Sequence, residues 1–375
     1  MAIRNKAQRD LNRTGRMTPY DARTAGTFSE APRTGPRPVH PPTAGEIRAS
    51  NYAKVDLAEK IGDVRAYVPE FREDMARMNE GKVGRPYEYS DALVFWLLTA
   101  MTLFNSDYRC AVGFFGPVLG YMGVRVPSYT RFLERCHALA GERLLEDGCD
   151  VKRRYGDGVL SVYVSPYVTD RVRRVGADSS GLSLSCPNRW RGKKWKGGTK
   201  DRGWLRFHVL SDLDTGEILA YAVSDESVGD APLLRPLVGM AAEGGHRFEK
   251  IYADGAYSSN RNWIYLTREN GYEFVTSFKV NTRPVSNGCL ARGLAAGFWC
   301  KTPYKVWTEA TGYHFRWKSE AGFSDFKEIF PETVTATSVR GMVLEVMART
   351  EVFNAFKGGG RAAIMKVTGN EVEVA

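Results

Sequence analysis

The sequence predicts an α/β fold in which a mixed sheet flanked by helices follows a smaller helical domain. Three observations predict it. Apolar residues recur at helical spacing between residues 51 and 145, strand-like segments begin near residue 171, and helices and strands then follow in the order βββ-α-β-α-β-α. That order is typical of a mixed sheet with helices packed on it. With 375 residues, 43% of them hydrophobic, the chain is long enough for two or three domains and a large core.

The N-terminal segment and the charge balance point to a polyanionic partner. Residues 1–49 are rich in Arg, Pro, Thr and Gly, which predicts a disordered basic arm, either a plain tail or a nonspecific contact to phosphates. The formal net charge of +10 favours nucleic acid or an anionic membrane surface. A solvated basic surface with no partner is the alternative.

Targeting and redox signals predict a cytoplasmic protein. The arginine-rich N-terminus lacks the apolar stretch of a secretory signal. The most apolar run, residues 92–104, is too short to cross a bilayer and predicts a buried helix. None of the six cysteines forms a C-x-x-C pair, so we expect reduced thiols and no zinc site.

Residues 50–150 are expected to form the helical domain. The first strong helix begins near Ser90 or Asp91, either of which can cap it. Two glycines separate the next two helices, so one interpretation is a helix-turn-helix with Arg131 and Arg135 on its recognition helix. The other is an all-α packing domain that does not read DNA. The three expected helices span residues 92–104, 108–119 and 127–139.

The sheet domain is expected from residue 165 to 357, with a C-terminal tail at residues 358–375. The turn-forming residues 212–216 join the second and third strands into a hairpin. Strands are expected at residues 172–182, 204–211, 217–223, 250–254 and 273–279, and helices at residues 230–242, 259–270 and 313–329.

Two aspartates lie in or at the end of apolar strands. Asp178 lies inside the first strand, and Asp254 ends the strand Ile251-Tyr252-Ala253-Asp254. A carboxylate in such a place is costly to bury unless something pairs with it, and a hard cation such as Mg²⁺ suits carboxylate oxygens. Taken singly, each is more simply explained as a turn-forming aspartate.

A third carboxylate lies in a polar stripe of one helix. At about 100° per residue, Tyr313, Arg316, Glu320 and Lys327 fall within roughly 60° around the helix axis. Phenylalanines outside the stripe can dock the helix while the stripe faces a site. The alternative is a solvated charged face with i,i+4 ion pairs.

These residues resemble a known family. Tyr313, Arg316, Glu320 and Lys327, read as Tyr-x2-Arg-x3-Glu-x6-Lys, resemble the Y-R-E-K motif of DDE transposases from prokaryotic insertion sequences. The segments Asp178-Ser179-Ser180-Gly181 and Tyr252-Ala253-Asp254-Gly255-Ala256-Tyr257 resemble the first-aspartate and second-aspartate segments of that family. The residues between them resemble its hairpin and following helix start, so the resemblance covers about residues 85–357.

The resemblance implies an RNase H-like catalytic domain. In it, Asp178, Asp254 and Glu320 would be the catalytic residues and would bind two Mg²⁺ or Mn²⁺ ions. Arg316 and Lys327 would hold phosphates near the scissile bond, and Tyr313 would stack or hydrogen-bond on the DNA backbone. The implied partners are double-stranded DNA, as terminal inverted repeats and target, and a second copy of the chain, in the nucleoid of a prokaryotic cytoplasm. The interval from Asp254 to Glu320 is too short for the large β-rich insertion of some members, which argues against cleavage chemistry that relies on it.

A basic loop between the first two strands fits the same partner. Its cations interleave with tryptophans, and cations neutralise phosphates while indoles stack on exposed bases. A solvated lysine-rich loop is the alternative. In addition, we expect His208 to be a packed core residue and Asp230 to be a helix N-cap. The expected DNA-binding cations of the loop are Arg189, Arg191, Lys193, Lys194 and Lys196.

The sequence therefore predicts a transposase that cleaves DNA and joins it by strand transfer. Two alternatives stay open: a catalytically inactive, element-derived DNA-binding protein or repressor, and an RNase H-like nuclease that cuts without joining. The intact acidic residues and the intact polar stripe argue against the first alternative.

Overall fold

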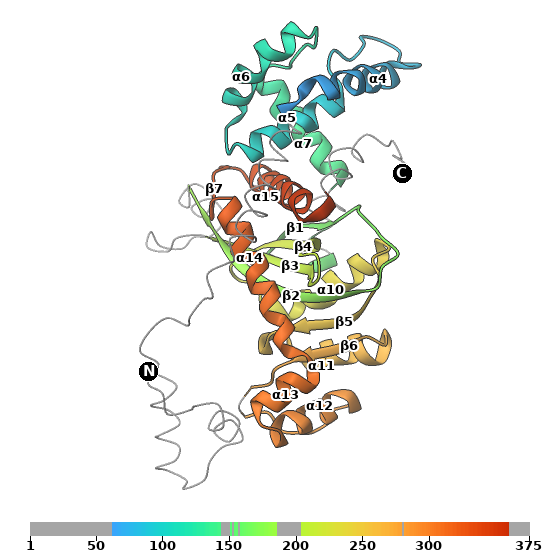
Figure 1. Cartoon of the computed structure of the whole chain (residues 1–375), viewed down its shortest axis with the longest axis vertical. Coiled ribbons are helices and arrows are strands. Elements are labelled where there is room, and N and C mark those ends of the chain that lie inside the picture. The colour runs from blue at the N-terminus through green and yellow to red at the C-terminus, as the bar shows by residue number, and fades with distance from the viewer. Residues whose placement is uncertain are drawn as a thin grey trace.

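A mixed sheet forms the centre of the computed structural model, which describes residues 62–143, 151, 154–156, 158–185, 204–279 and 281–359. The strand order is β1-β4-β3-β2-β5-β6, and β7 pairs with the end of β2 (Figure 1). The strands are β1 (Val159–Val164), β2 (Arg173–Leu184), β3 (Trp204–Asp212), β4 (Ile218–Asp225), β5 (Phe248–Ala253), β6 (Glu273–Thr276) and β7 (Thr333–Val334).

The strand pairing confirms the predicted mixed sheet. Strands β1, β4, β3 and β2 run antiparallel to their neighbours, whereas β2, β5 and β6 are parallel. The predicted hairpin is the pair β3–β4. Strands β1 and β7 were not predicted, and β1 begins before residue 165, so the sheet starts earlier than expected. The last predicted strand is shorter, because β6 ends at Thr276.

Helices cover both faces of the sheet (Figure 1). Helix α10 (Asp230–Glu243) packs on one face, where Leu234 joins Val175 and Leu210 in one buried cluster. Helices α14 (Trp317–Ile329) and α15 (Val339–Asn354) cover the other face. Because neighbouring strand residues point to opposite faces, β3 contributes Val209 to the α14 side and Leu210 to the α10 side.

The five N-terminal helices are η1 (Val64–Tyr67), α4 (Val68–Asn79), α5 (Asp91–Leu103), α6 (Tyr108–Tyr121) and α7 (Tyr129–Arg143). Three of them, α5, α6 and α7, lie close to the predicted ranges, and η1 and α4 were not predicted. Ser90 caps α5, because its hydroxyl accepts a hydrogen bond from the Leu93 N–H at 3.1 Å. The apolar run in α5 is buried, as expected. Among the described residues, no helix is both long and apolar enough to cross a membrane.

Helix α15 joins these helices to the sheet. It packs on α5 and α7 on one side and on β1 and β4 on the other (Figure 1). Leu97 of α5, Phe132 of α7 and Phe353 of α15 belong to the same buried cluster as Phe207 of β3. The core is therefore continuous across the predicted domain boundary near residue 150.

The segment between the second aspartate and the glutamate is helical. It contains η2 (Gly255–Tyr257), α11 (Asn260–Trp263), the π-helical turn η3 (Ile264–Glu269), α12 (Leu290–Lys301) and α13 (Tyr304–Thr311). In the described residues between β6 and α14 there is no strand. The predicted helix at residues 313–329 begins as a 3-10 turn, η4 (Tyr313–Arg316), and continues as α14.

Candidate active site

Asp178 and Asp254 lie side by side on neighbouring parallel strands. Ala177 pairs with Ala253, so the two aspartates take the next position on β2 and at the end of β5. Parallel strands lie about 4.8 Å apart, and residues in register point to the same face. The Asp254 carboxylate also accepts a hydrogen bond from the Ala256 N–H, which caps the turn after β5.

A close contact between α14 and β2 brings the helix that carries Glu320 next to Asp178. A Cβ atom at Gly176 would lie 2.0 Å from Ser319 Oγ and 2.7 Å from Leu213 Cδ2. Only a glycine therefore lets α14 approach β2 this closely. Ser319 is buried at this contact, and Glu320 is the next residue of the helix.

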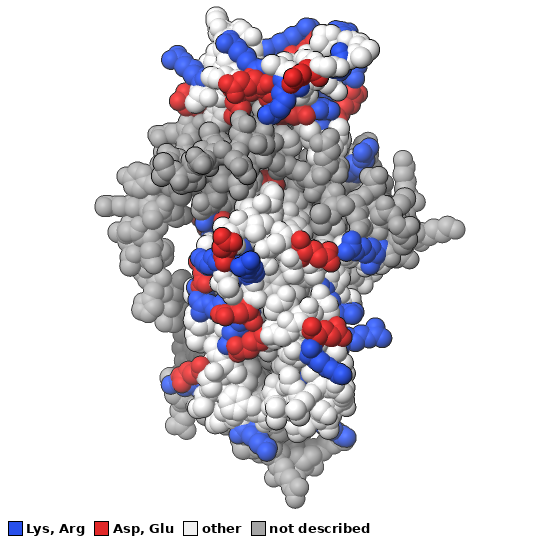
Figure 2. Space-filling view, turned by 90° about the vertical axis from the view of Figure 1, so that its right-hand side faces the viewer, with Lys and Arg blue, Asp and Glu red and all other residues white. Residues whose placement is uncertain are grey.

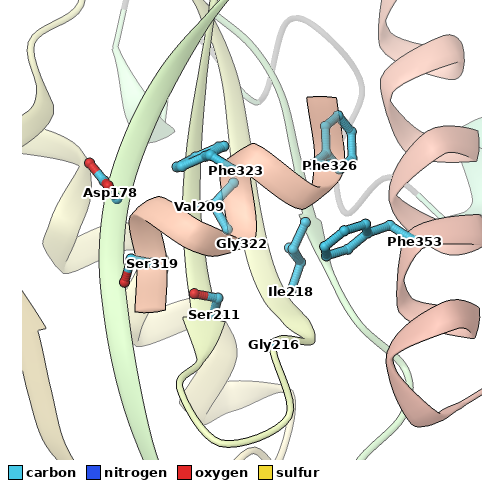
Figure 3. Close-up of a pocket in the computed structure, with 10 residues that line it drawn as sticks. All are labelled: Asp178, Val209, Ser211, Gly216, Ile218, Ser319, Gly322, Phe323, Phe326 and Phe353. Carbon is cyan, nitrogen blue, oxygen red and sulfur yellow. The ribbon is translucent and has the colours of Figure 1, made fainter. Parts of the chain in front are cut away.

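The pocket beneath α14 is not the acid site itself. Figure 3 shows that the Asp178 carboxylate points away from the other labelled side chains. Most of those are apolar and come from β3, β4, α14 and α15, and Phe326 and Phe353 among them belong to the core. The pocket is a gap in the packing under the helix, and Asp178 lies at its border.

The three carboxylates influence one another electrostatically. The pKa of Asp178 is raised from 3.8 to about 6, mainly by burial and to a smaller extent by the charges of Asp254 and Glu320. A hydrogen bond from the Ser179 N–H at 2.9 Å and the charge of Arg316 act in the opposite direction. A cation placed among these carboxylates would remove most of this unfavourable energy.

Glu320 is turned toward Arg316 on its own helix. The two form an i,i+4 ion pair, and the Glu320 side chain is 57% exposed. Within the described ranges, no three Asp, Glu, His or Cys side chains are close enough together to hold a metal ion. The three carboxylates are therefore near one another without converging on a single point.

The other two residues of the polar stripe have protein partners. The Lys327 ammonium lies 2.9 Å from a Glu332 carboxylate oxygen. Tyr313 is buried, donates a hydrogen bond to Ser277 Oγ at 3.2 Å, and packs with its ring centroid 4.8 Å from that of Trp307. A DNA contact by the Tyr313 ring, as predicted, would require this packing to open.

The two arginines predicted to read DNA differ in their surroundings. Arg135 donates to both carboxylate oxygens of Asp91, at 2.7 and 2.6 Å, and so ties α7 to α5. Arg131 is 68% exposed and pairs with Glu134 one turn along the same helix. Arg131 is therefore the more accessible of the two.

The predicted basic loop lies outside the described residues, as does the N-terminal arm. On the face of the molecule shown in Figure 2, acidic and basic side chains alternate over the N-terminal helices, and large areas below carry no charge. This face, as far as the chain is described, is not a surface of one sign.

Two features near the acids were missed or misjudged. The N-cap of α10 is Gly229, not Asp230 as predicted. Instead, Asp230 accepts a hydrogen bond from Ser179 Oγ at 2.7 Å, and His208 Nδ1 lies 3.3 Å from it. Burial alone would raise the pKa of Asp230, but His208, Ser179 and Arg206 outweigh it and hold the pKa below its usual value. His208 is fully buried, as predicted for a core residue.

The second missed residue is Trp317. Its indole is 58% exposed, and it lies three positions before Glu320 on α14, so both side chains project from nearby points of the helix. Its position in the sequence between Arg316 and Glu320 was the signal available.

A comparison with known protein families found one match. Residues 172–354 match the family model described as the transposase DDE domain. No curated protein and no solved structure matches the chain. The matched segment contains all three carboxylates and supports a DDE transposase, and a mixed sheet flanked by helices is consistent with such a domain.

Proposed function

We propose that this protein is the transposase of a prokaryotic insertion sequence of the Y-R-E-K branch, which cleaves DNA at the ends of its element and transfers the strands to a target. The observation that carries the proposal is the register of β2 and β5. It sets Asp178 and Asp254 side by side within the segment that matches the transposase DDE domain. Glu320 lies across from them on a helix that Gly176 allows to approach.

The residues fit a pair of divalent metal ions. Asp178 is a half-buried carboxylate whose pKa rises because it is buried and because two other carboxylates lie near it. Oxygen donors of this kind suit Mg²⁺ and Mn²⁺. For Glu320 to bind an ion, its carboxylate must leave Arg316, which is easy for an exposed side chain.

The bound ions would activate water or a 3′-hydroxyl and neutralise charge on the phosphate. The side chains of the protein would position the ions and hold the DNA phosphates. Asp178 lies on β2 and Asp254 directly follows β5, so the pairing of these two strands would position both carboxylates before DNA binds. Arg316, released from Glu320, is free to hold a phosphate beside the scissile bond. Lys327 lies two helical turns further along α14 and can hold the next part of the backbone.

The same proposal extends to the wider DNA contact. Arg131 and the cations of the 189–196 loop would neutralise phosphates of the terminal repeats, and two copies of the chain would bring the two ends together. Arg135 would have to give up its contact with Asp91 to take part.

The test uses the full chain with labelled duplexes that carry the DNA on each side of its gene. With Mg²⁺ or Mn²⁺ we expect cleavage at the element ends followed by joining to a target plasmid. Asp178→Ala, Asp254→Ala and Glu320→Ala should each abolish cleavage and leave DNA binding intact. Binding without cleavage by the unaltered protein would favour an inactive DNA-binding protein, and cleavage without joining would favour a nuclease.

A further inference from the structure

A polar network lies behind Asp178, on the α10 side of the sheet. Ser179 on β2 and His208 on β3 are cross-strand neighbours. Both reach Asp230 in the first turn of α10: Ser179 Oγ donates to Asp230 Oδ1 at 2.7 Å, and His208 Nδ1 lies 3.3 Å from the same oxygen. An Arg206 nitrogen lies 3.6 Å from it. One hydrogen bond and two nearby basic side chains thus meet at the same carboxylate oxygen.

The neighbours of His208 decide where its hydrogens lie. The ring is fully buried, and its Nε2 lies 2.9 Å from Ser224 Oγ. If Nε2 alone carried a hydrogen, the Nδ1 lone pair would face the Asp230 carboxylate, and two acceptors would repel each other. A hydrogen on Nδ1 removes this repulsion, although the 3.3 Å contact with Asp230 does not reach hydrogen-bond geometry.

The combination of serine, histidine and aspartate here is not a nucleophilic triad. In such a triad the imidazole lies between the hydroxyl and the carboxylate and takes the hydroxyl proton. Here the Asp230 carboxylate lies between Ser179 and His208. The Ser179 hydroxyl is therefore held as a hydrogen-bond donor, and the network orients groups without reacting.

The backbone connects this network to the acid site. The Ser179 N–H donates to Asp178 Oδ1 at 2.9 Å. Adjacent strand residues point to opposite faces, so holding the Ser179 side chain toward α10 also holds the Asp178 side chain toward α14. The Asp178 oxygen that does not accept this bond stays available to a metal ion.

We propose that Asp230, acting through Ser179, is a positioning residue that holds the Asp178 carboxylate in its metal-binding orientation. The proposal rests on the metal-dependent function proposed above and adds a part for residues that do not touch the metal. Groups of this kind typically change metal affinity or activity by about 10–100-fold when they are removed.

The decisive variant is Ser179→Ala, which removes the hydroxyl and keeps the backbone N–H. Ser179→Thr restores a hydroxyl at the same position. Ser183→Ala is the matched control, because Ser183 lies on the same strand and its hydroxyl is 2.9 Å from Thr333 Oγ1, away from the acids. Asp230→Asn tests the carboxylate itself, since it keeps the shape and removes the charge.

Two readouts are measured against Mn²⁺ concentration: the rise in Tm of the DNA-free protein and the rate of end cleavage. We expect Ser179→Ala and Asp230→Asn to need about 10–100-fold more Mn²⁺ than the unaltered protein in both readouts. Ser179→Thr and Ser183→Ala should behave like the unaltered protein.

An unchanged Mn²⁺ dependence in Ser179→Ala would overturn the inference alone. If the Tm of this variant without metal were also lower, the network would only stabilise the fold. If Mn²⁺ neither stabilises the unaltered protein nor supports cleavage, the proposed function falls, and this inference falls with it.

Discussion

The contact between Gly176 and Ser319 offers a sharp test of how the third carboxylate is positioned. In Gly176→Ala, the new methyl group would lie 2.0 Å from Ser319 Oγ, whereas ordinary contacts are about 3.5 Å. We expect helix α14 to move by roughly 1 Å and to carry Glu320 with it, because Ser319 is buried and Leu213 Cδ2 lies 2.7 Å from the same methyl group. A displacement of this size costs about 10²-fold in rate, and overpacking costs about 1–3 kcal/mol of stability.

The assay is single-turnover cleavage of an end duplex in Mn²⁺, together with thermal denaturation. Gly176→Ala should cleave about 10²-fold more slowly and lose several degrees of Tm. Adding Ser319→Ala removes the clashing oxygen and leaves Ser319 Cβ at 3.4 Å, but Leu213 Cδ2 stays at 2.7 Å, so the double variant should recover part of both losses. The control Gly322→Ala lies on the same helix with no neighbour within 4 Å and should not slow cleavage.

The reasoning would be refuted by Gly176→Ala that cleaves at the unaltered rate, or by a double variant that recovers neither quantity. The first result would mean that α14 does not depend on this contact for its position. The second would mean that the loss arises elsewhere than at Ser319.

Three further predictions follow from the same site and from α7. In EDTA at pH 7.5, Asp178→Asn should stabilise the protein by up to about 3 kcal/mol, because the pKa of Asp178 is raised from 3.8 to about 6 and its charge destabilises the folded state above that pH. This advantage should shrink as the pH falls through 6 toward 4, and a less stable variant at pH 7.5 would contradict it. Arg316→Gln removes the partner that competes with metal for Glu320, so Mn²⁺ should raise Tm at a lower concentration than in the unaltered protein. Cleavage should nevertheless fall about 10²-fold, because the phosphate loses its arginine. A variant that needs more Mn²⁺ to raise its Tm and also cleaves more slowly would argue against this competition. Arg131→Ala should lower the salt dependence of DNA binding by about one phosphate contact, which binding titrations at several salt concentrations can measure. Arg135→Ala should mainly lower Tm, which thermal denaturation can measure.

Local patterns predicted much of the sheet and the acid site. Asp178 and Asp254 were identifiable because a carboxylate in or at the end of an apolar strand is an expensive exception. Glu320 was identifiable because it shares one helical register with Arg316 and Lys327. Each of these signals could be found within a short stretch of sequence around the residue concerned.

Helix α15 was missed because it is packed on several sides. Its polar residues Arg349, Thr350 and Asn354 are buried and satisfied inside the protein, so the helix lacks the clear apolar stripe of a surface helix. Asn354, for example, exchanges hydrogen bonds with both backbone groups of Ile218 on β4. Only the tertiary structure gives those side chains their partners.

The Asp230 network was missed for a different reason. Its members Ser179, His208 and Asp230 come from three elements, and their meeting depends on the register of β2 against β3. The turn-like sequence around Gly229 predicted a cap, which is the commoner use of an aspartate at a helix start. Contacts set by strand register leave no mark in a local pattern.

The position of α15 also governs how a nascent chain can fold. Helices α4 to α7 are synthesised before α15, yet part of their core is supplied by α15. Those helices cannot complete their packing until the C-terminal part of the chain is made. Gene copies truncated before residue 339 would therefore yield unstable polypeptides, not free-standing helical fragments that compete with the full-length protein for DNA.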